Sequence, residues 1–244
     1  MVRVIKMSKD SLLVISAHSA DYVWRAGGVI AKYVKEGHRV KVICLSYGER
    51  GESAELWKKG YNLDKIKEIR REESENAAKT LGTAIEFFDW DDYPLIINHE
   101  RLMQIVRTIR DFKPDIILTH GPKDPFNVDH VTTANNVLEG SILSIANGVM
   151  PDIPVIKQPR IFGFEHHQSE LSEFYPDVII DISGVFDLKK QAMDFFQTQK
   201  HLIDYYSMRA SMRGNHARRV SGNAGYSHAE AFLRYFPYVG GEFP

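Results

Sequence analysis

The sequence predicts a single α/β domain with a Rossmann-like, mostly parallel sheet that helices cover on both faces. Short apolar runs alternate with amphipathic segments, which is typical of parallel strands joined by crossover helices. The 244 residues fit one large domain, and a hydrophobic content of 43% is that of an ordinary globular protein. We see no repeat, low-complexity segment or domain boundary within residues 1–244.

The first elements follow from clear local patterns. Residues 12–16 form an apolar run of strand length, and residues 21–35 have the periodicity of a helix. Residues 40–45 predict a second strand, and a polar loop with two glycines follows it. Residues 64–81 carry opposite charges four positions apart and stop before Gly82, which predicts a surface helix.

The later elements are predicted from the same patterns. Apolar runs indicate strands over 85–88, 115–118, 161–165 and, as the last strand, 178–182. Amphipathic segments indicate helices over 100–112, 130–146 and, as one long final stretch, 184–212.

Composition argues against several classes of function. A net charge of -1 gives no reason to expect nucleic acid or a membrane surface as a partner. No apolar run approaches the roughly 20 residues that span a bilayer, and the N-terminus does not resemble a signal peptide. The single cysteine, Cys44, rules out an intrachain disulfide and favours a reducing compartment, so we expect a cytoplasmic protein.

Polar residues gather in the loops that follow predicted strands, and such loops meet at the carboxyl edge of a parallel sheet. His18, Asp21 and His130 are the most economical metal site among them, because two imidazoles and a carboxylate suit zinc and leave a position open. Each residue also has an ordinary explanation. A histidine at a strand end is usually a hydrogen-bonded loop residue, and Asp21 could cap a helix.

Four short motifs carry most of these residues. They are Ala-His-Ser-Ala-Asp at 17–21, Gly-Glu-Arg-Gly-Glu at 48–52, Arg-Glu-Glu at 71–73 and Asn-Val-Asp-His at 127–130. Together they resemble the LmbE-like (PIG-L) family of zinc-dependent deacetylases. The resemblance implies an LmbE-like fold and Zn²⁺, or another divalent metal, held by His18, Asp21 and His130. It also implies that Asp129 orients a metal ligand from outside the coordination sphere.

Two positions depart from the family pattern. The family has an aspartate, its general base, where this chain has Ala20, and an assisting histidine where it has Asn127. Losing both would cost a deacetylase several orders of magnitude in rate, although the metal ligands are intact. We therefore expect changed chemistry rather than amide hydrolysis.

Longer segments match a smaller branch of the family, including these departures. They are residues 16–28, 44–57, 123–130 and 164–168. They resemble the hydratases that act on 4-oxalomesaconate in gallate and protocatechuate breakdown. The resemblance implies a hydro-lyase that adds water to the C=C bond of an unsaturated oxo-carboxylic acid, and it favours a homo-oligomer.

A hydratase must activate water, stabilise an enolate and deliver a proton to carbon. Without an aspartate at position 20, we expect Glu52 to be the base. Glu49 is the alternative, although an ion pair with Arg50 would also explain that residue. For the proton donor we expect His167, because histidine titrates near neutral pH, and His120 is a further option.

Cations are needed to bind a substrate with several carboxylates. Arg25 and Arg50 lie in matched segments and are the expected clamps, with Asn127 as a hydrogen-bonding partner or merely a helix cap. Arg213 and Arg218 are weaker candidates. Other functions remain open, namely an N-deacetylase of an amino-sugar conjugate with Glu52 as a relocated base, or a non-catalytic metal or small-molecule binder. A nucleotide-binding Rossmann protein is disfavoured, since no Gly-x-Gly-x-x-Gly follows the first strand.

Overall fold

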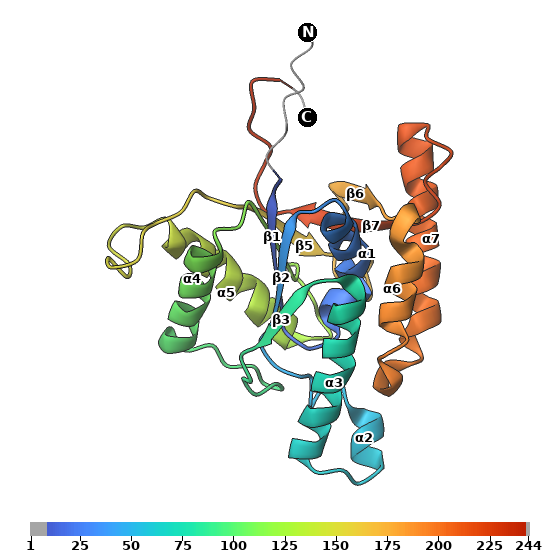
Figure 1. Cartoon of the computed structure of the whole chain (residues 1–244), viewed down its shortest axis with the longest axis horizontal. Helices are drawn as coiled ribbons and strands as arrows, with labels where there is room; N and C mark the ends of the chain where they lie inside the picture. Colours follow the sequence, from blue (N-terminus) through green and yellow to red (C-terminus); the bar gives the residue numbers. More distant parts are fainter. Residues whose placement is uncertain (1–8, 243–244) are drawn as a thin grey trace.

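A seven-stranded sheet lies at the centre of the computed structural model, which describes residues 9–242 (Figure 1). In spatial order its strands are β3 (Ala84–Phe87), β2 (Arg39–Cys44), β1 (Ser11–Ser16), β4 (Ile116–Thr119), β5 (Arg160–Phe164), β7 (Ala229–Arg234) and β6 (Val178–Asp181). The first five run parallel, and β7 lies antiparallel to both β5 and β6. The mostly parallel sheet predicted from the sequence is confirmed.

Helices cover both faces of this sheet (Figure 1). They are α1 (Asp21–Lys35), α2 (Ala54–Lys58), α3 (Leu63–Leu81), α4 (His99–Phe112), α5 (Val128–Ser144), α6 (Phe186–Met193) and α7 (Leu202–Ser221), with short 3₁₀ turns at Ser183–Val185 and Gln197–Gln199. Helices α4 and α5 pack together on one face. Helices α1, α3 and α6 pack against one another on the other face, beside α7.

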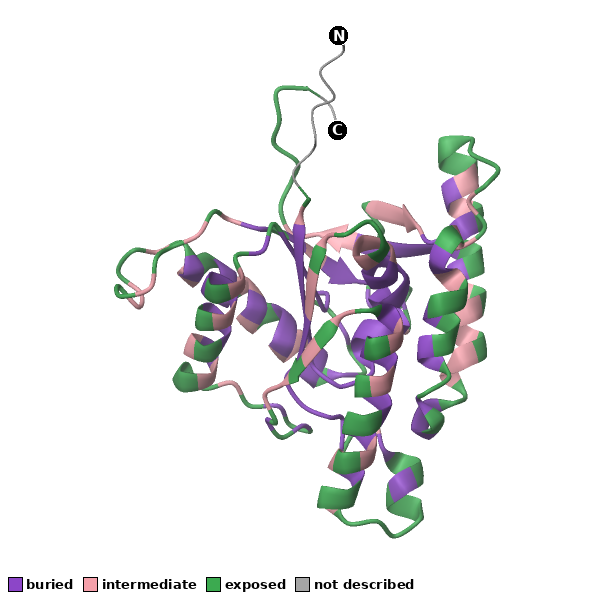
Figure 2. Cartoon of the chain, viewed as in Figure 1, coloured by how far each residue is buried: buried purple, intermediate pink, exposed green. Residues whose placement is uncertain are grey.

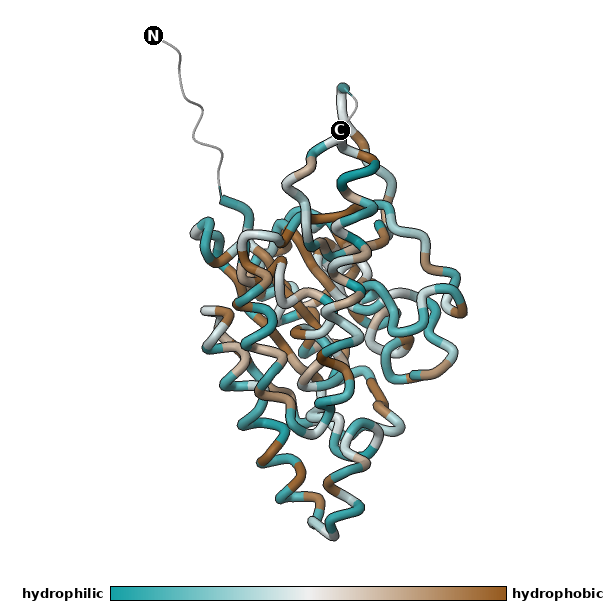
Figure 3. The backbone as a smooth tube through the Cα atoms, turned by 90° about the vertical axis from the view of Figure 1, so that its right-hand side faces the viewer, coloured by the Kyte–Doolittle hydropathy of each residue, from teal (hydrophilic) through white to brown (hydrophobic). Residues whose placement is uncertain are grey.

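Side-chain alternation along the strands divides the core between the two faces. On β1, Leu12 and Val14 join the apolar cluster beneath α1, α3, α6 and α7, whereas Leu13 and Ile15 join the cluster beneath α4 and α5. Figure 2 shows this burial along the strands and on the inner sides of the helices, and Figure 3 shows the same strands as the most hydrophobic part of the trace. Within residues 9–242, no helix is both long and apolar enough to cross a membrane.

The predicted helix over 184–212 is wrong as one continuous element. The chain leaves α-helical geometry between α6 and α7, where it forms only the 3₁₀ turn at Gln197–Gln199, and we call residues 194–201 the strap. There the backbone N–H of Thr198 donates to the Glu73 carboxylate of α3 at 3.0 Å, so a side chain supplies its acceptor. The strand over 178–182 is also not the last, because β7 follows α7 and inserts beside β5. The short helix α2 was not predicted either.

The sheet has its topological switch point between β1 and β4. From β1 the chain moves outward to β2 and β3, and it then returns to the other side of β1 as β4. Loops diverge at the carboxyl ends of these two strands, which leaves a crevice where ligands bind in open α/β sheets. The motifs at 17–21 and 127–130 both lie at this point.

Candidate metal centre and substrate pocket

Four potential metal ligands converge at the switch point. His18 follows β1, Asp21 begins α1, Glu52 lies in the loop after β2, and His130 lies in the first turn of α5. One ligand atom from each residue lies within 4.8 Å of the others, and we call this group of four residues the metal cluster. The structure thus brings together the three predicted ligands, and it adds the carboxylate that was predicted to be a base.

Buried carboxylates orient both imidazoles. His18 Nε2 lies 3.3 Å from Asp129 Oδ2, and His130 Nδ1 lies 2.8 Å from Asp124 Oδ2. An ionised carboxylate only accepts hydrogen bonds, so each of these ring nitrogens carries the proton. With a metal ion bound, the other two nitrogens, His18 Nδ1 and His130 Nε2, would present their lone pairs to it.

These two nitrogens are buried and have no hydrogen-bond partner within the described part of the chain. His18 Nδ1 lies 3.3 Å from Asp21 Oδ2 and 3.2 Å from Glu52 Oε1, and His130 Nε2 lies 3.4 Å from Asp21 Oδ1. A buried polar atom without a partner is costly. Two orphaned imidazole nitrogens that face two carboxylates therefore fit a divalent metal ion, with the outer carboxylates holding the rings.

Asp129 and Asp21 are themselves held in place. Asp129 accepts the backbone N–H groups of Tyr93 at 2.9 Å and Leu95 at 2.8 Å, which ties the loop after β3 to the centre. Asp21 accepts a hydrogen bond from the Arg25 guanidinium. Burial alone would raise the pKa of Asp21, but His130 and Arg25 hold it well below its usual range. Asp21 is therefore a carboxylate ready to bind a cation.

Glycine lets the loop after β2 approach this centre. Gly51 donates its N–H to Asp92 Oδ2 at 2.8 Å, and a Cβ at this position would lie 2.0 Å from the Tyr93 ring. No larger residue fits there unless the Tyr93 ring or the loop shifts. The backbone therefore stays close to the metal cluster, and the next residue, Glu52, enters it.

A cavity of about 200 Å³ opens beside the cluster. Its first wall comes from the metal side and from α1, and includes Asp21, Trp24, Arg25, Glu52, Asp124, Phe126, Asn127 and His130. The opposite wall comes from later parts of the chain, namely His167, Gln199, Leu202 and Tyr206. Both charged and apolar groups therefore face a ligand in this cavity.

The predicted residues Arg25, Asn127 and His167 all line the cavity. Asn127 also caps α5, since its Oδ1 accepts the N–H groups of Asp129 at 3.1 Å and His130 at 3.3 Å. The His167 ring stacks on Tyr205 at 4.3 Å. Burial and the nearby Arg25 lower the pKa of His167 to about 4, so the free protein holds a neutral imidazole there at pH 7.

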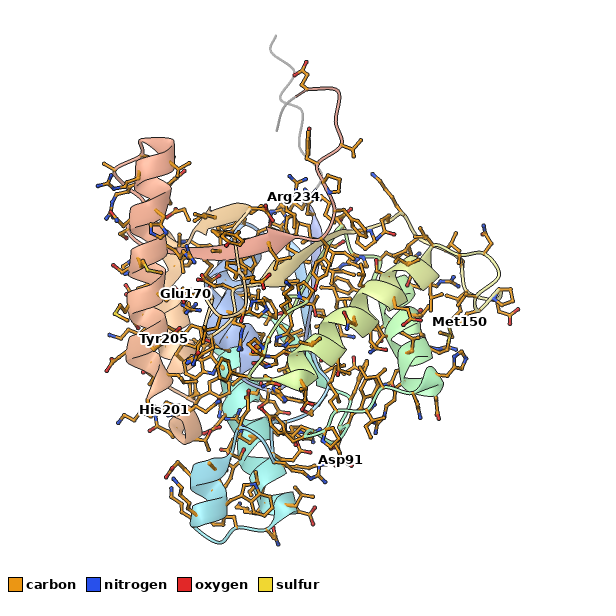
Figure 4. All side chains as sticks on the ribbon, turned by 180° about the vertical axis from the view of Figure 1, so that it is seen from behind. Asp91, Met150, Glu170, His201, Tyr205 and Arg234 are labelled. Carbon is orange, nitrogen blue, oxygen red and sulfur yellow. The ribbon has the colours of Figure 1, made fainter. Side chains whose placement is uncertain are left out.

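Arg50 and Glu49 lie elsewhere. The Arg50 guanidinium contacts Asp91 at 3.0 Å and Glu49 at 3.6 Å, and neither Arg50 nor Glu49 lines the cavity. In Figure 4, Asp91, which pairs with Arg50, lies well apart from Tyr205, which stacks on the cavity residue His167. This geometry supports the ion-pair explanation for Glu49 and gives Arg50 no contact with a ligand in the cavity.

The other candidates have structural contacts. His120 Nε2 accepts the Ala17 N–H at 3.0 Å, and the ring stacks on His130 at 4.0 Å. Burial and the neighbouring His130 lower the pKa of His120 to about 3, so it is neutral and supports a ligand. Arg213 pairs with Glu165 at 2.9 Å, and Arg218 donates to the Tyr226 carbonyl at 2.9 Å.

Several residues that line the cavity were not predicted from the sequence, among them Asp124, Phe126, Gln199, Leu202 and Tyr206. Asp124 lies within the matched segment 123–130, but nothing in the sequence shows that this loop folds back onto His130. Gln199, Leu202 and Tyr206 lie in the stretch predicted as one helix, where the break between α6 and α7 brings them to the cavity. The sequence pattern alone does not distinguish these three residues from other positions of a helix, because their burial depends on how the stretch packs.

Comparisons with known proteins identify the family and the relatives of this chain. Residues 13–140 match the PIG-L family model, described as GlcNAc-PI de-N-acetylase. The chain is 40% identical over 241 residues to a 4-oxalmesaconate hydratase from Pseudomonas putida, covering 97% of this chain and 93% of that protein. The crystal structure of GalB, the 4-carboxy-2-hydroxymuconate hydratase from P. putida, superposes with a TM-score of 0.93 at 41% identity, covering 96% of this chain and all of that one.

A more distant structure has the same fold. The N,N'-diacetylchitobiose deacetylase from Pyrococcus horikoshii superposes with a TM-score of 0.77 at 22% identity, covering 92% of this chain and 83% of that one. At this identity the likeness concerns the fold alone.

Proposed function

The chain belongs to the PIG-L family, and on this premise we propose that it is a metal-dependent hydratase. It adds water across the C=C bond of an unsaturated oxo-carboxylic acid, with 4-oxalomesaconate or a close relative as its substrate. The likeness to the P. putida hydratase, at 40% identity over 97% of the chain, supports this proposal. The observation that carries it is Glu52, which provides a carboxylate at the metal cluster where Ala20 cannot serve as a base.

Zinc is the proposed metal, and His18, Asp21 and His130 would hold it. Two imidazoles and one carboxylate are a usual ligand set for zinc, and Asp129 and Asp124 fix the two rings. When bound, a divalent ion lowers the pKa of water and polarises a substrate oxygen. The chain's single cysteine, Cys44, is buried and unpaired, which supports a cytoplasmic location.

Glu52 is the proposed base. Its Oε1 lies 3.2 Å from His18 Nδ1, and the residue also lines the cavity, so the carboxylate touches both the metal cluster and the space for substrate. From this position Glu52 accepts the proton of the attacking water. The same closeness makes Glu52 a potential metal ligand, and the experiment below separates the two roles.

The opposite wall supplies the proposed proton donor. His167 lies across the cavity from Glu52, with Nδ1 3.4 Å from the Tyr206 hydroxyl. Its imidazole is neutral in the free protein, as its lowered pKa shows. A substrate with several carboxylates brings negative charge next to it and raises its pKa again, which enables the ring to carry a proton to carbon.

Arg25 and Asn127 are the proposed substrate ligands. One Arg25 nitrogen binds Asp21, whereas its Nε is buried without a partner in the described structure. A substrate carboxylate would satisfy the free donors of this guanidinium. Asn127 uses its oxygen for the α5 cap, so its amide N–H groups stay available to a ligand in the cavity.

An absorbance assay tests this function. Purified protein is given 4-oxalomesaconate or a panel of N-acetylated sugars, each before and after metal removal by a chelator and after zinc is restored. We expect turnover of the oxo-acid that depends on metal. Hydrolysis of the acetylated sugars without turnover of the oxo-acid would show that the protein is a deacetylase instead.

The role of Glu52 is tested in the same assay. Glu52→Gln should lower kcat by about 100- to 10,000-fold, the usual contribution of a general base. The matched control, Glu55→Gln, changes an exposed carboxylate on α2 and should behave like the wild type. Zinc content measured on both variants separates the two roles, since a lost base leaves zinc in place and a lost ligand does not.

A further inference from the structure

The strap, residues 194–201, is fastened to α3 by buried polar contacts. The Glu73 carboxylate accepts the Thr198 backbone N–H at 3.0 Å and the Thr198 hydroxyl at 2.7 Å. Arg70, which is fully buried, donates through Nε to the Tyr47 carbonyl at 3.1 Å and through Nη2 to Gln199 Oε1, also at 3.1 Å. The strap is therefore a fixed part of the cavity wall, and Gln199 is held within it.

Two donors fix the orientation of the Gln199 amide. Its Oε1 accepts from Arg70 Nη2 at 3.1 Å and from Trp24 Nε1 at 3.4 Å. Neither the arginine guanidinium nor the tryptophan indole can accept a hydrogen bond, so the amide oxygen must face them. The amide nitrogen then faces Glu52, with Nε2 3.4 Å from Glu52 Oε2.

The two oxygens of Glu52 consequently have different surroundings. Oε1 points to the metal cluster, 3.2 Å from His18 Nδ1, and Oε2 points to Gln199 and to Arg70 Nη2 at 3.8 Å. A carboxylate held through one oxygen cannot rotate freely about its last bond. The other oxygen is thereby kept directed at the cluster.

We propose that Gln199 is a positioning residue for Glu52, which keeps Oε1 of that carboxylate directed at the reacting water. This inference rests on the proposed function in one respect, because it takes Glu52 as the base. Gln199 acts through its N–H group on Glu52 Oε2, and Arg70 and Trp24 set the direction of that N–H. The strap thus contributes to catalysis through a residue that need not touch the metal.

Two substitutions test the kinetic side. Gln199→Glu keeps an acceptor for Arg70 and Trp24 but places an oxygen against Glu52 Oε2, and Gln199→Met removes the polar group at similar length. We expect both to lower kcat by about 10- to 100-fold, the usual cost of losing such a supporting contact, with KM near the wild-type value. The matched control is Gln197→Glu, an exposed position on the same strap, which should leave kcat unchanged.

A stability cycle tests the contact without any turnover. The double variant Glu52→Gln with Gln199→Glu exchanges the amide and the carboxylate between the two positions. The amide introduced at position 52 can then donate to the carboxylate introduced at position 199. On metal-free protein, we expect Gln199→Glu to lower Tm by a few degrees and the double variant to recover most of this loss.

If the change in Tm of the double variant equals the sum of the changes in Glu52→Gln and Gln199→Glu, the proposal is overturned. It is also overturned if Gln199→Glu raises KM and leaves kcat unchanged, because the strap then has a purely structural role. If the wild type fails to turn over the oxo-acid, the proposed function is wrong, whereas the Tm cycle still reports on the contact between Gln199 and Glu52. The two failures are therefore distinguishable.

Discussion

The contact between Asp124 and His130 gives the sharpest prediction about the metal centre. Asp124 is 8% exposed, and its Oδ2 lies 2.8 Å from His130 Nδ1. Burial opposes ionisation, yet His130 and Arg25 lower the pKa of Asp124 from 3.8 to about 2. A difference of this size corresponds to roughly 2 kcal/mol of favourable interaction with the ionised carboxylate. Asp124→Ala removes this interaction and frees the ring of His130 to turn.

We expect Asp124→Ala to raise the dissociation constant of the bound metal by about 10- to 100-fold. This corresponds to about 1.4 to 2.7 kcal/mol, the same range as the interaction derived from the pKa. Asp124→Asn should lose less, because the amide oxygen still accepts from His130 Nδ1. Competition of the metal-free protein with a coloured chelator measures these constants. Asp91→Asn, at an exposed carboxylate, is the control. An unchanged dissociation constant in Asp124→Ala would refute the view that Asp124 orients this ligand.

Three further predictions concern the rest of the chain. Burial raises the pKa of Cys44 to about 12, so a chromogenic thiol reagent should react with it only after urea unfolds the protein. Gly28→Ala should lower the free energy of unfolding by about 1 to 3 kcal/mol in a urea titration, because its Cβ would lie 2.5 Å from Ile182 Cδ1. His167 has a lowered pKa in the folded state, so its unfolded form binds the proton first. Its contribution to stability is complete above pH 6.5 and is lost as the pH falls to about 4, and urea titrations of His167→Asn across this range should show a weaker pH dependence.

Much of the sheet could be predicted because its signals are local. The run at 12–16 is recognisable as a strand through its own apolar side chains, and the loops at the carboxyl ends of parallel strands must meet. His18, Asp21 and His130 were therefore expected to converge from their place after predicted strands and from the family motifs.

The strap could not be predicted, because its cause lies far away in the sequence. The backbone N–H of Thr198 donates to the carboxylate of Glu73, a residue 125 positions earlier, instead of to a carbonyl of the preceding helical turn. Strand β7 was missed for a related reason, since its pairing with β5 and β6 depends on long-range contacts. Arg50 shows the same limit at the level of one side chain. An arginine can bind a substrate carboxylate, but in the folded chain the Arg50 guanidinium pairs with the Asp91 carboxylate instead.

The two walls of the cavity come from separate stretches of the chain. All four residues of the metal cluster lie between positions 18 and 130, within the segment 13–140 that matches the family model. The facing wall, with His167, Gln199, Leu202 and Tyr206, comes entirely from beyond that segment. The metal ligands and the facing wall therefore come from different parts of the chain, whereas Arg25 and Asn127, the proposed substrate ligands, lie in the same segment as the metal ligands. Substitutions at His167, Leu202 or Tyr206 can thus change the shape of the cavity without replacing a metal ligand.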